Sequence, residues 1–270
     1  MPEVLEERLV DAYLAHIGAQ RPQRADVAAL RHLQERHVLS VPFETIAFYT
    51  REPVPHSTSA VRKIVDQRRG GSCFELNSAF ALLLRALGYE LDILQGRIYR
   101  NSVLDSRPGH MALRVRTPGL PGPGEVSWLV DVGQGRNSRY PLRLDAHEPQ
   151  EDPHGTYLLV NAPEGDVDVL LDGNPIYRME SRVISEEYGE ATVWWYLTSP
   201  KSPFVKHPIC ILPDENGRRS LVGNTLISEV NGRRTVRKLT TDAELLMAYK
   251  ANFGIELDQV PQPSDVTPVR

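Results

Sequence analysis

The stretch Arg69-Gly70-Gly71-Ser72-Cys73-Phe74-Glu75, with the apolar run that follows it as far as Gly88, decides the interpretation of this chain. Two adjacent glycines permit a tight turn and a close approach of the backbone to a neighbouring group. The apolar side chains beyond them recur at helical spacing; they are Leu76, Phe80, Leu83, Leu84 and Leu87. The sequence therefore predicts a long apolar helix that starts at Cys73, directly after a glycine turn, and ends at Gly88.

The position of Cys73 favours a nucleophilic role. The N-terminus of a helix presents unpaired N–H groups and a partial positive charge, and both favour the thiolate form of a cysteine. Thiolate is the form that attacks an electrophile. A buried structural cysteine is the commoner fate of this residue type, but the position after Arg69-Gly70-Gly71 indicates a catalytic residue.

A thiolate nucleophile needs a base, and the base needs a group that orients it. His110 precedes a run of alternating apolar residues, so a strand would place His110 on the face opposite Met111. Asp131 lies in the apolar run 126–132, where a buried carboxylate requires a hydrogen-bonding partner. A His N–H supplies that partner. We therefore predict a Cys73–His110–Asp131 triad of the thiol-protease and transglutaminase-like type.

The sequence pattern divides the chain into three parts. Residues 1–90 show helical spacing, and the expected helices are 5–17, 25–37, 60–67 and the one that begins at Cys73. Residues 91–197 contain short β-prone runs separated by Gly and Pro, which predict a small barrel or a curled sheet; the runs are 91–99, 111–117, 126–132, 157–160, 167–171 and 192–197. Residues 198–270 predict two or three more strands and a final helix, Asp242–Phe253, capped by Thr241 or Asp242.

Composition excludes several classes of protein. A net charge of −4, with no Lys/Arg block, argues against nucleic acid as the main partner. No uncharged apolar run approaches the ~18 residues of a membrane span, and the acidic first residues lack the apolar segment of a signal peptide. We expect a cytoplasmic protein with no membrane partner. Two cysteines, Cys73 and Cys210, are too few for a disulfide framework or a cysteine-based zinc site, so we expect no metal.

These residues resemble those of the arylamine N-acetyltransferase family. The specific matches are Arg69-Gly-Gly-x-Cys73-Phe-Glu-x-Asn77, Gly109-His110-x-x-Leu113-x-Val and Val130-Asp131-Val-Gly-x-Gly135. Weaker matches are Tyr13-Leu-Ala-His-Ile-Gly18, Val41-Pro-Phe43-Glu44, Thr198-Ser-Pro-x-Ser202-x-Phe204 and Phe253-Gly-Ile. The resemblance therefore spans nearly the whole chain, in order.

The resemblance implies an α+β fold of three domains. Residues 1–90 would form a helical bundle that carries the nucleophile, residues 91–197 a β-barrel that carries His110 and Asp131, and residues 198–270 an α/β lid. The implied reaction has Cys73 take an acetyl or other acyl group from a coenzyme A thioester and pass it to an arylamine or a related small-molecule amine. The thioester is a co-substrate, and no permanently bound cofactor is implied.

The resemblance also implies a substrate-binding set, which comprises Phe43, Gln134, Ser202 and Phe204. Ser202 and Phe204 fall in a segment that helps to line the acyl-donor cleft of relatives. Gln134 stands where the family usually has a phenylalanine of the acceptor pocket, so we predict a more polar pocket here. Two further departures are Ser72 in place of an aromatic residue and Thr45 in place of an asparagine.

Three alternative functions fit the same residues. An amide synthase of the polyketide type would take its acyl chain from an acyl carrier protein and close a macrolactam. A transglutaminase-like thiol hydrolase has the same order of Cys, His and Asp, although the glycines near Cys73 and after Asp131 argue against it. A non-catalytic binding module with a vestigial triad is the least favoured, because the predicted triad is complete.

Overall fold

The computed structural model describes residues 4–119, 124–135 and 138–263. Its helices are α1 (Glu7–Ile17), α2 (Val27–Ser40), α3 (Ile46–Thr50), α4 (Ser57–Gln67), α5 (Cys73–Ala86), α6 (Glu186–Thr198) and α7 (Asp242–Phe253), with the 3₁₀ turns η1 (Pro163–Gly165) and η2 (Pro203–Val205). Its strands are β1 (Phe43–Glu44), β2 (Glu90–Arg100), β3 (Val103–Leu104), β4 (His110–Pro118), β5 (Glu125–Val130), β6 (Leu142–Arg143), β7 (Gln150–Asp152), β8 (Gly155–Asn161), β9 (Val167–Leu171), β10 (Asn174–Ile184), β11 (Ile209–Asp214), β12 (Gly217–Val222), β13 (Thr225–Val230) and β14 (Arg233–Lys238). Among the described helices, none has the length and apolarity that crossing a membrane requires.

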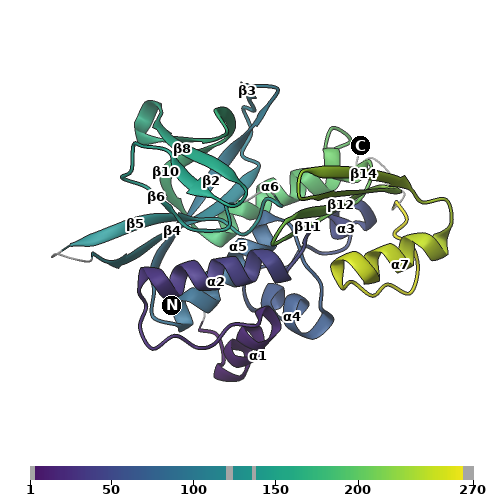
Figure 1. Cartoon of the computed structure of the whole chain (residues 1–270), viewed down its shortest axis with the longest axis horizontal. Helices are drawn as coiled ribbons and strands as arrows, with labels where there is room; N and C mark the ends of the chain where they lie inside the picture. The colour runs from purple at the N-terminus through teal and green to yellow at the C-terminus, as the bar shows by residue number, and fades with distance from the viewer. Residues whose placement is uncertain (1–3, 120–123, 136–137, 264–270) are drawn as a thin grey trace.

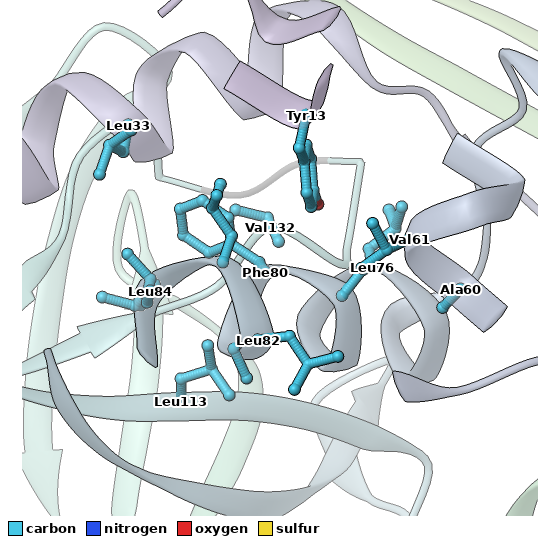
Figure 2. Packing of buried hydrophobic residues seen from close by; sticks show 14 of the residues in the cluster. Tyr13, Leu33, Ala60, Val61, Leu76, Phe80, Leu82, Leu84, Leu113 and Val132 are labelled. Carbon is cyan, nitrogen blue, oxygen red and sulfur yellow. The ribbon is translucent and has the colours of Figure 1, made fainter. Parts of the chain in front are cut away.

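Helix α5 runs through the middle of the molecule, between the other N-terminal helices and the central sheet (Figure 1). Every residue from Cys73 to Leu84 is buried, as expected for a helix that must pack on all sides. Figure 2 shows Tyr13 of α1 and Val61 of α4 near the α5 side chains, while Leu82 of α5 faces Leu113 of β4. This packing holds the first residue of α5 where the helices meet the sheet.

The central sheet curls into a nearly closed barrel, which confirms the predicted barrel-like form (Figure 1). Its strands follow the order β6-β5-β4-β2-β10-β9-β8-β7, and β3 pairs with β2. The two edge strands, β6 and β7, are linked through one side chain: Gln150 accepts a hydrogen bond from the Arg143 N–H (2.7 Å) and donates one to the Arg143 carbonyl (3.1 Å). Buried side chains fill the inside of the barrel, among them Ala112, Tyr157 and Tyr177.

The C-terminal sheet has the order β1-β11-β12-β13-β14 and packs against α7 (Figure 1). Its first strand, β1, comes from the N-terminal part of the chain: Phe43 pairs with Ile211, and Glu44 pairs with Cys210. The division into domains 1–90, 91–197 and 198–270 remains a proposal. The β1–β11 ladder joins the first and last of these parts.

Most predicted elements are confirmed, and α7 and β9 have the predicted bounds. The strand expected at 192–197 is wrong, because these residues lie in helix α6. Threonine, valine and aromatic residues favour strands, but Ser185 followed by Glu186 and Glu187 marks the start of a helix. Strand β10 was not predicted, since a register shift between Met179 and Val183 interrupts its alternation.

Candidate active site

The turn before Cys73 is dictated by space. A Cβ atom on Gly70 would lie 1.7 Å from the Pro42 carbonyl oxygen, and one on Gly71 would lie 2.7 Å from the Cβ of Glu75. Both distances are shorter than the contacts that real Cβ atoms make, so no other residue type fits without a shift of its neighbours. This confirms the close approach predicted for the two glycines. Cys73 follows as the first residue of α5 and is 7% exposed.

Four charged side chains support this turn: Glu44, Lys63 and Glu75 are buried, and Arg69 is half-buried. Glu44 accepts hydrogen bonds from the Arg69 guanidinium (2.7 and 3.1 Å) and lies 3.3 Å from the Lys63 ammonium. Lys63 also donates to Glu75 (2.6 Å), whose other oxygen accepts from the Ser72 N–H (2.7 Å). Burial acts to raise the pKa of Glu44, but the two cations outweigh it and hold the pKa below its usual value. The cluster ties β1 to the start of α5.

His110 is the first residue of β4, opposite Gly96 of β2. The predicted alternation is confirmed: Met111 packs in the cluster around α5, whereas Ala112 lies inside the barrel. The His110 ring accordingly points inward and packs against Tyr177, with the ring centroids 4.7 Å apart. Its Nε2 lies 2.7 Å from Oδ2 of Asp131, so Nδ1 is the ring nitrogen left to face the sulfur of Cys73, which His110 contacts.

Asp131 lies just beyond the end of β5, not inside a strand as predicted. Its second oxygen, Oδ1, accepts hydrogen bonds from the Gly133 N–H (2.9 Å) and from the Asn77 amide (3.1 Å). Asn77 also donates to the Met111 carbonyl (2.7 Å) and accepts from the Val132 N–H (3.1 Å). One α5 side chain therefore fixes the strand that carries His110 and the turn that carries Asp131. The family resemblance included Asn77, but no role was predicted for it.

The electrostatics of the site favour the charged forms of His110 and Asp131. Burial by itself lowers the pKa of His110, but the charge and hydrogen bond of Asp131, with the contact to Cys73, raise it to about 10. Burial acts to raise the pKa of Asp131, yet the His110 cation and three hydrogen bonds hold it below its usual value. At neutral pH the site therefore holds an imidazolium and a carboxylate, with the positive charge beside the sulfur of Cys73.

Two glycines place Gln134 next to Cys73. A Cβ atom on Gly133 would lie 2.5 Å from the Cα of Cys73, so Gly133 packs directly against that residue. Gly135 has a left-handed φ of +66°, and a Cβ there would lie 2.9 Å from Ile211 of the C-terminal sheet. The half-buried Gln134 is held between these two contacts. A cavity of about 320 Å³ between the barrel and the C-terminal sheet reaches Gly135.

The other predicted substrate-binding residues lie in different settings. Phe43 is half-buried and forms a parallel bridge with Gly71 in the turn before Cys73. Ser202 is fully buried, and its hydroxyl accepts a hydrogen bond from the Phe204 N–H (3.3 Å), so its side chain caps η2. The Phe204 ring packs against Phe48 and Tyr196, at centroid distances of 5.4 and 5.2 Å. Contact of any of these side chains with substrate remains a prediction.

Comparison with known proteins agrees with this geometry. A family profile described as N-acetyltransferase matches residues 26–261. The arylamine N-acetyltransferase of Mycolicibacterium smegmatis is 30% identical over 256 residues, which cover 91% of each chain. The Escherichia coli (strain K12) arylamine N-acetyltransferase is 29% identical over 263 residues, which cover 93% of this chain and 90% of the relative.

Solved structures give the same result. The M. smegmatis arylamine N-acetyltransferase structure superposes with a TM-score of 0.83 at 29% identity and covers 92% of each chain. The Mycobacterium marinum enzyme, solved in complex with CoA, superposes with a TM-score of 0.82 at 26% identity, over 91% of this chain and 92% of that one. With the sequence profile spanning most of its length, this chain belongs to the arylamine N-acetyltransferase family.

Proposed function

We propose that this protein transfers an acetyl group from acetyl-CoA to an arylamine or a related amine, through an acetyl-Cys73 intermediate. The observation that carries the proposal is the arrangement at the start of α5, where Cys73 contacts His110 and His110 lies 2.7 Å from Asp131. Family membership supports the reaction, because the named relatives are arylamine N-acetyltransferases and one of them was solved with CoA. It favours acyl transfer over the transglutaminase-like hydrolase.

In the first half-reaction, the Cys73 thiolate attacks the thioester carbonyl carbon. The new C–S bond forms as the carbonyl π electrons move to oxygen, and the tetrahedral intermediate then expels the CoA thiolate. The His110 imidazolium gives its proton to this leaving group. Asp131 stays ionised throughout, because it holds the ring in place and stabilises its cationic form.

In the second half-reaction, the amine nitrogen attacks the acetyl carbon on Cys73. His110, now neutral, takes the proton that the amine loses, and the intermediate collapses to the amide with release of the Cys73 thiolate. The enzyme returns to its starting charge state.

A mechanism that needs a free thiol fits a reducing compartment such as the cytoplasm, and the two cysteines of this chain are unpaired.

For the substrates, we propose that Phe43, Gln134 and Phe204 border the acceptor and the acyl group, and that Ser202 shapes the turn on which Phe204 stands. The proposal for Phe43 rests on its backbone bridge to Gly71 in the turn before Cys73, and the proposal for Gln134 rests on the packing of its neighbour Gly133 against Cys73. The cavity that reaches Gly135 is a candidate entry for the CoA thioester. The alternative to a CoA thioester is an acyl carrier protein as the acyl donor.

Intact-protein mass spectrometry tests this function. We expect incubation with acetyl-CoA to add the mass of one acetyl group, and subsequent addition of an arylamine to remove it. Cys73→Ala should take up no acetyl group, whereas Cys210→Ala, which removes the other buried cysteine, should be acetylated like the wild type. Acetylation of the Cys73→Ala protein would refute the assignment. Labelling by an acyl-carrier thioester but not by acetyl-CoA would mean that the donor is an acyl carrier protein and not acetyl-CoA.

A further inference from the structure

Tyr196, near the end of α6, brings a hydroxyl group to the candidate active site. The residue is 4% exposed. A Cβ atom on Gly109 would lie 2.4 Å from the Tyr196 hydroxyl oxygen, so the hydroxyl rests directly on the residue before His110. The carbonyl oxygen of the same Gly109 is 3.9 Å from the sulfur of Cys73. One glycine thus separates the hydroxyl from the nucleophile.

The surroundings of the Tyr196 hydroxyl leave its proton for another partner. The hydroxyl oxygen interacts with the Arg100 side chain. A guanidinium has donors only, so the tyrosine oxygen can only accept from it, and the O–H is not used there. Burial raises the pKa of Tyr196 above its ordinary value, so the group is a neutral hydroxyl at physiological pH.

The ring of Tyr196 is held on several sides. It meets Phe48 edge-on, with centroids 6.5 Å apart and an interplanar angle of 89°, and it packs against Phe204 at 5.2 Å. The neighbouring Trp195 is itself anchored by the Arg107 guanidinium, 4.4 Å from its ring centroid. These contacts fix the direction of the hydroxyl, which is what a preorganised hydrogen-bond donor requires.

We propose that the Tyr196 hydroxyl donates a hydrogen bond to the acyl carbonyl oxygen when that oxygen becomes negatively charged, in both half-reactions. The role rests on the proposed function. When sulfur or amine attacks, the carbonyl π electrons move to oxygen, and the Tyr196 O–H binds this oxyanion without transferring its proton. Backbone N–H groups in the first turn of α5 lie at the same site, and the tyrosine adds a side-chain donor.

This role differs from two others that the same position allows. If Tyr196 only packs against Phe48 and Phe204, then its ring matters and its hydroxyl does not. If the hydroxyl binds the amine, then its loss changes the KM for the amine and leaves acetylation of Cys73 unaffected. An oxyanion donor instead affects the rate constants of both half-reactions.

The test is Tyr196→Phe, which keeps the ring and removes the hydroxyl. The matched control is Tyr89→Phe: Tyr89 is equally buried, and its hydroxyl donates to the Asp26 carbonyl (2.9 Å), away from Cys73. Rapid-quench kinetics would follow Cys73 acetylation by acetyl-CoA and by p-nitrophenyl acetate, then deacetylation by aniline. We expect Tyr196→Phe to slow both steps by about 10²–10³-fold, the usual effect of removing one oxyanion donor, and Tyr89→Phe to slow neither.

The outcomes separate the two proposals. A wild-type protein that neither donor acetylates overturns the proposed function and the role of Tyr196 with it. If the wild type is acetylated and Tyr196→Phe reacts within about tenfold of its rate, a difference under about 1.4 kcal/mol, only the role of Tyr196 is overturned. A change confined to the KM for aniline also overturns it and assigns the hydroxyl to the acceptor. Circular dichroism and thermal unfolding would verify that both variants fold.

Discussion

Replacing Asp131 with asparagine would test the electrostatics of the triad most directly. The side chain keeps its size and one oxygen, but it loses the charge that holds the pKa of His110 at about 10 against the effect of burial. Without that charge, burial dominates, and we expect the pKa of His110 to fall below its ordinary 6.5. Such a fall weakens protonation of the ring by about 5 kcal/mol. At neutral pH His110 would then be neutral.

The expected consequence is a large loss of activity with a smaller loss of stability. In a serine-protease triad the same exchange costs about 10⁴ in turnover, because the ring adopts the wrong tautomer. Here the amide oxygen, in the place of Oδ1, can still accept from the Gly133 N–H and from Asn77, but the NH₂ in the place of Oδ2 then opposes His110, which donates to Asp131 in the native protein. NMR titration of His110 and the rate of Cys73 alkylation by iodoacetamide against pH would measure the two effects.

Two results would contradict this role of Asp131. If His110 in the Asp131→Asn protein still titrates near 10, the charge of Asp131 is not what raises its pKa. If the variant acetylates Cys73 at the native rate, Asp131 is a structural residue of the turn after β5. The control is Asp152→Asn, a change at another buried carboxylate that accepts a backbone N–H, from Tyr140 (3.0 Å), and lies outside the triad.

Three further predictions follow from the site. His110→Gln should flatten the pH dependence of stability. The raised pKa of His110 adds to the free energy of unfolding fully below about pH 6.5, and this stabilisation is lost as the pH rises toward 10. The free energy of unfolding measured in urea should therefore fall more steeply over that range for the wild type than for the variant. Asn77→Ala should cost about 2–5 kcal/mol of unfolding free energy, because it leaves the buried Met111 carbonyl and Val132 N–H unpaired. Gln134→Phe should raise kcat/KM for unsubstituted aryl amines several-fold relative to hydroxyl- or carboxyl-bearing ones.

Each of these has its own control. Equal pH slopes for wild type and His110→Gln would mean that the imidazolium is not stabilised by folding. Asn252→Ala removes a single amide hydrogen bond, to the Ala248 carbonyl (3.0 Å), at a partly buried position, and an equal cost at Asn77 would contradict the network. An unchanged ranking of amines in Gln134→Phe would mean that this side chain does not meet the acceptor.

Much of the molecule follows from local sequence patterns. The glycine turn, the buried helix after it and the alternation that turns His110 into the barrel are set by residues a few positions apart, so spacing alone predicts them. The final helix, Asp242–Phe253, was predictable because its Thr241 cap and its stop at Gly254 are local signals. The motifs likewise pointed to Cys73, His110 and Asp131, which the structure brings together.

Contacts between distant residues were decided only by the tertiary structure. Asn77 meets Asp131 across 54 positions, and Glu44 meets Arg69 across 25; neither pairing leaves a periodic signal. Tyr196 lies in a segment whose composition favours a strand, yet tertiary packing and the start signal at Ser185 make it a helix that delivers a hydroxyl to Gly109. Local spacing determines which residue types face inward, whereas the long-range packing of α5 between helices and barrel determines which of them meet.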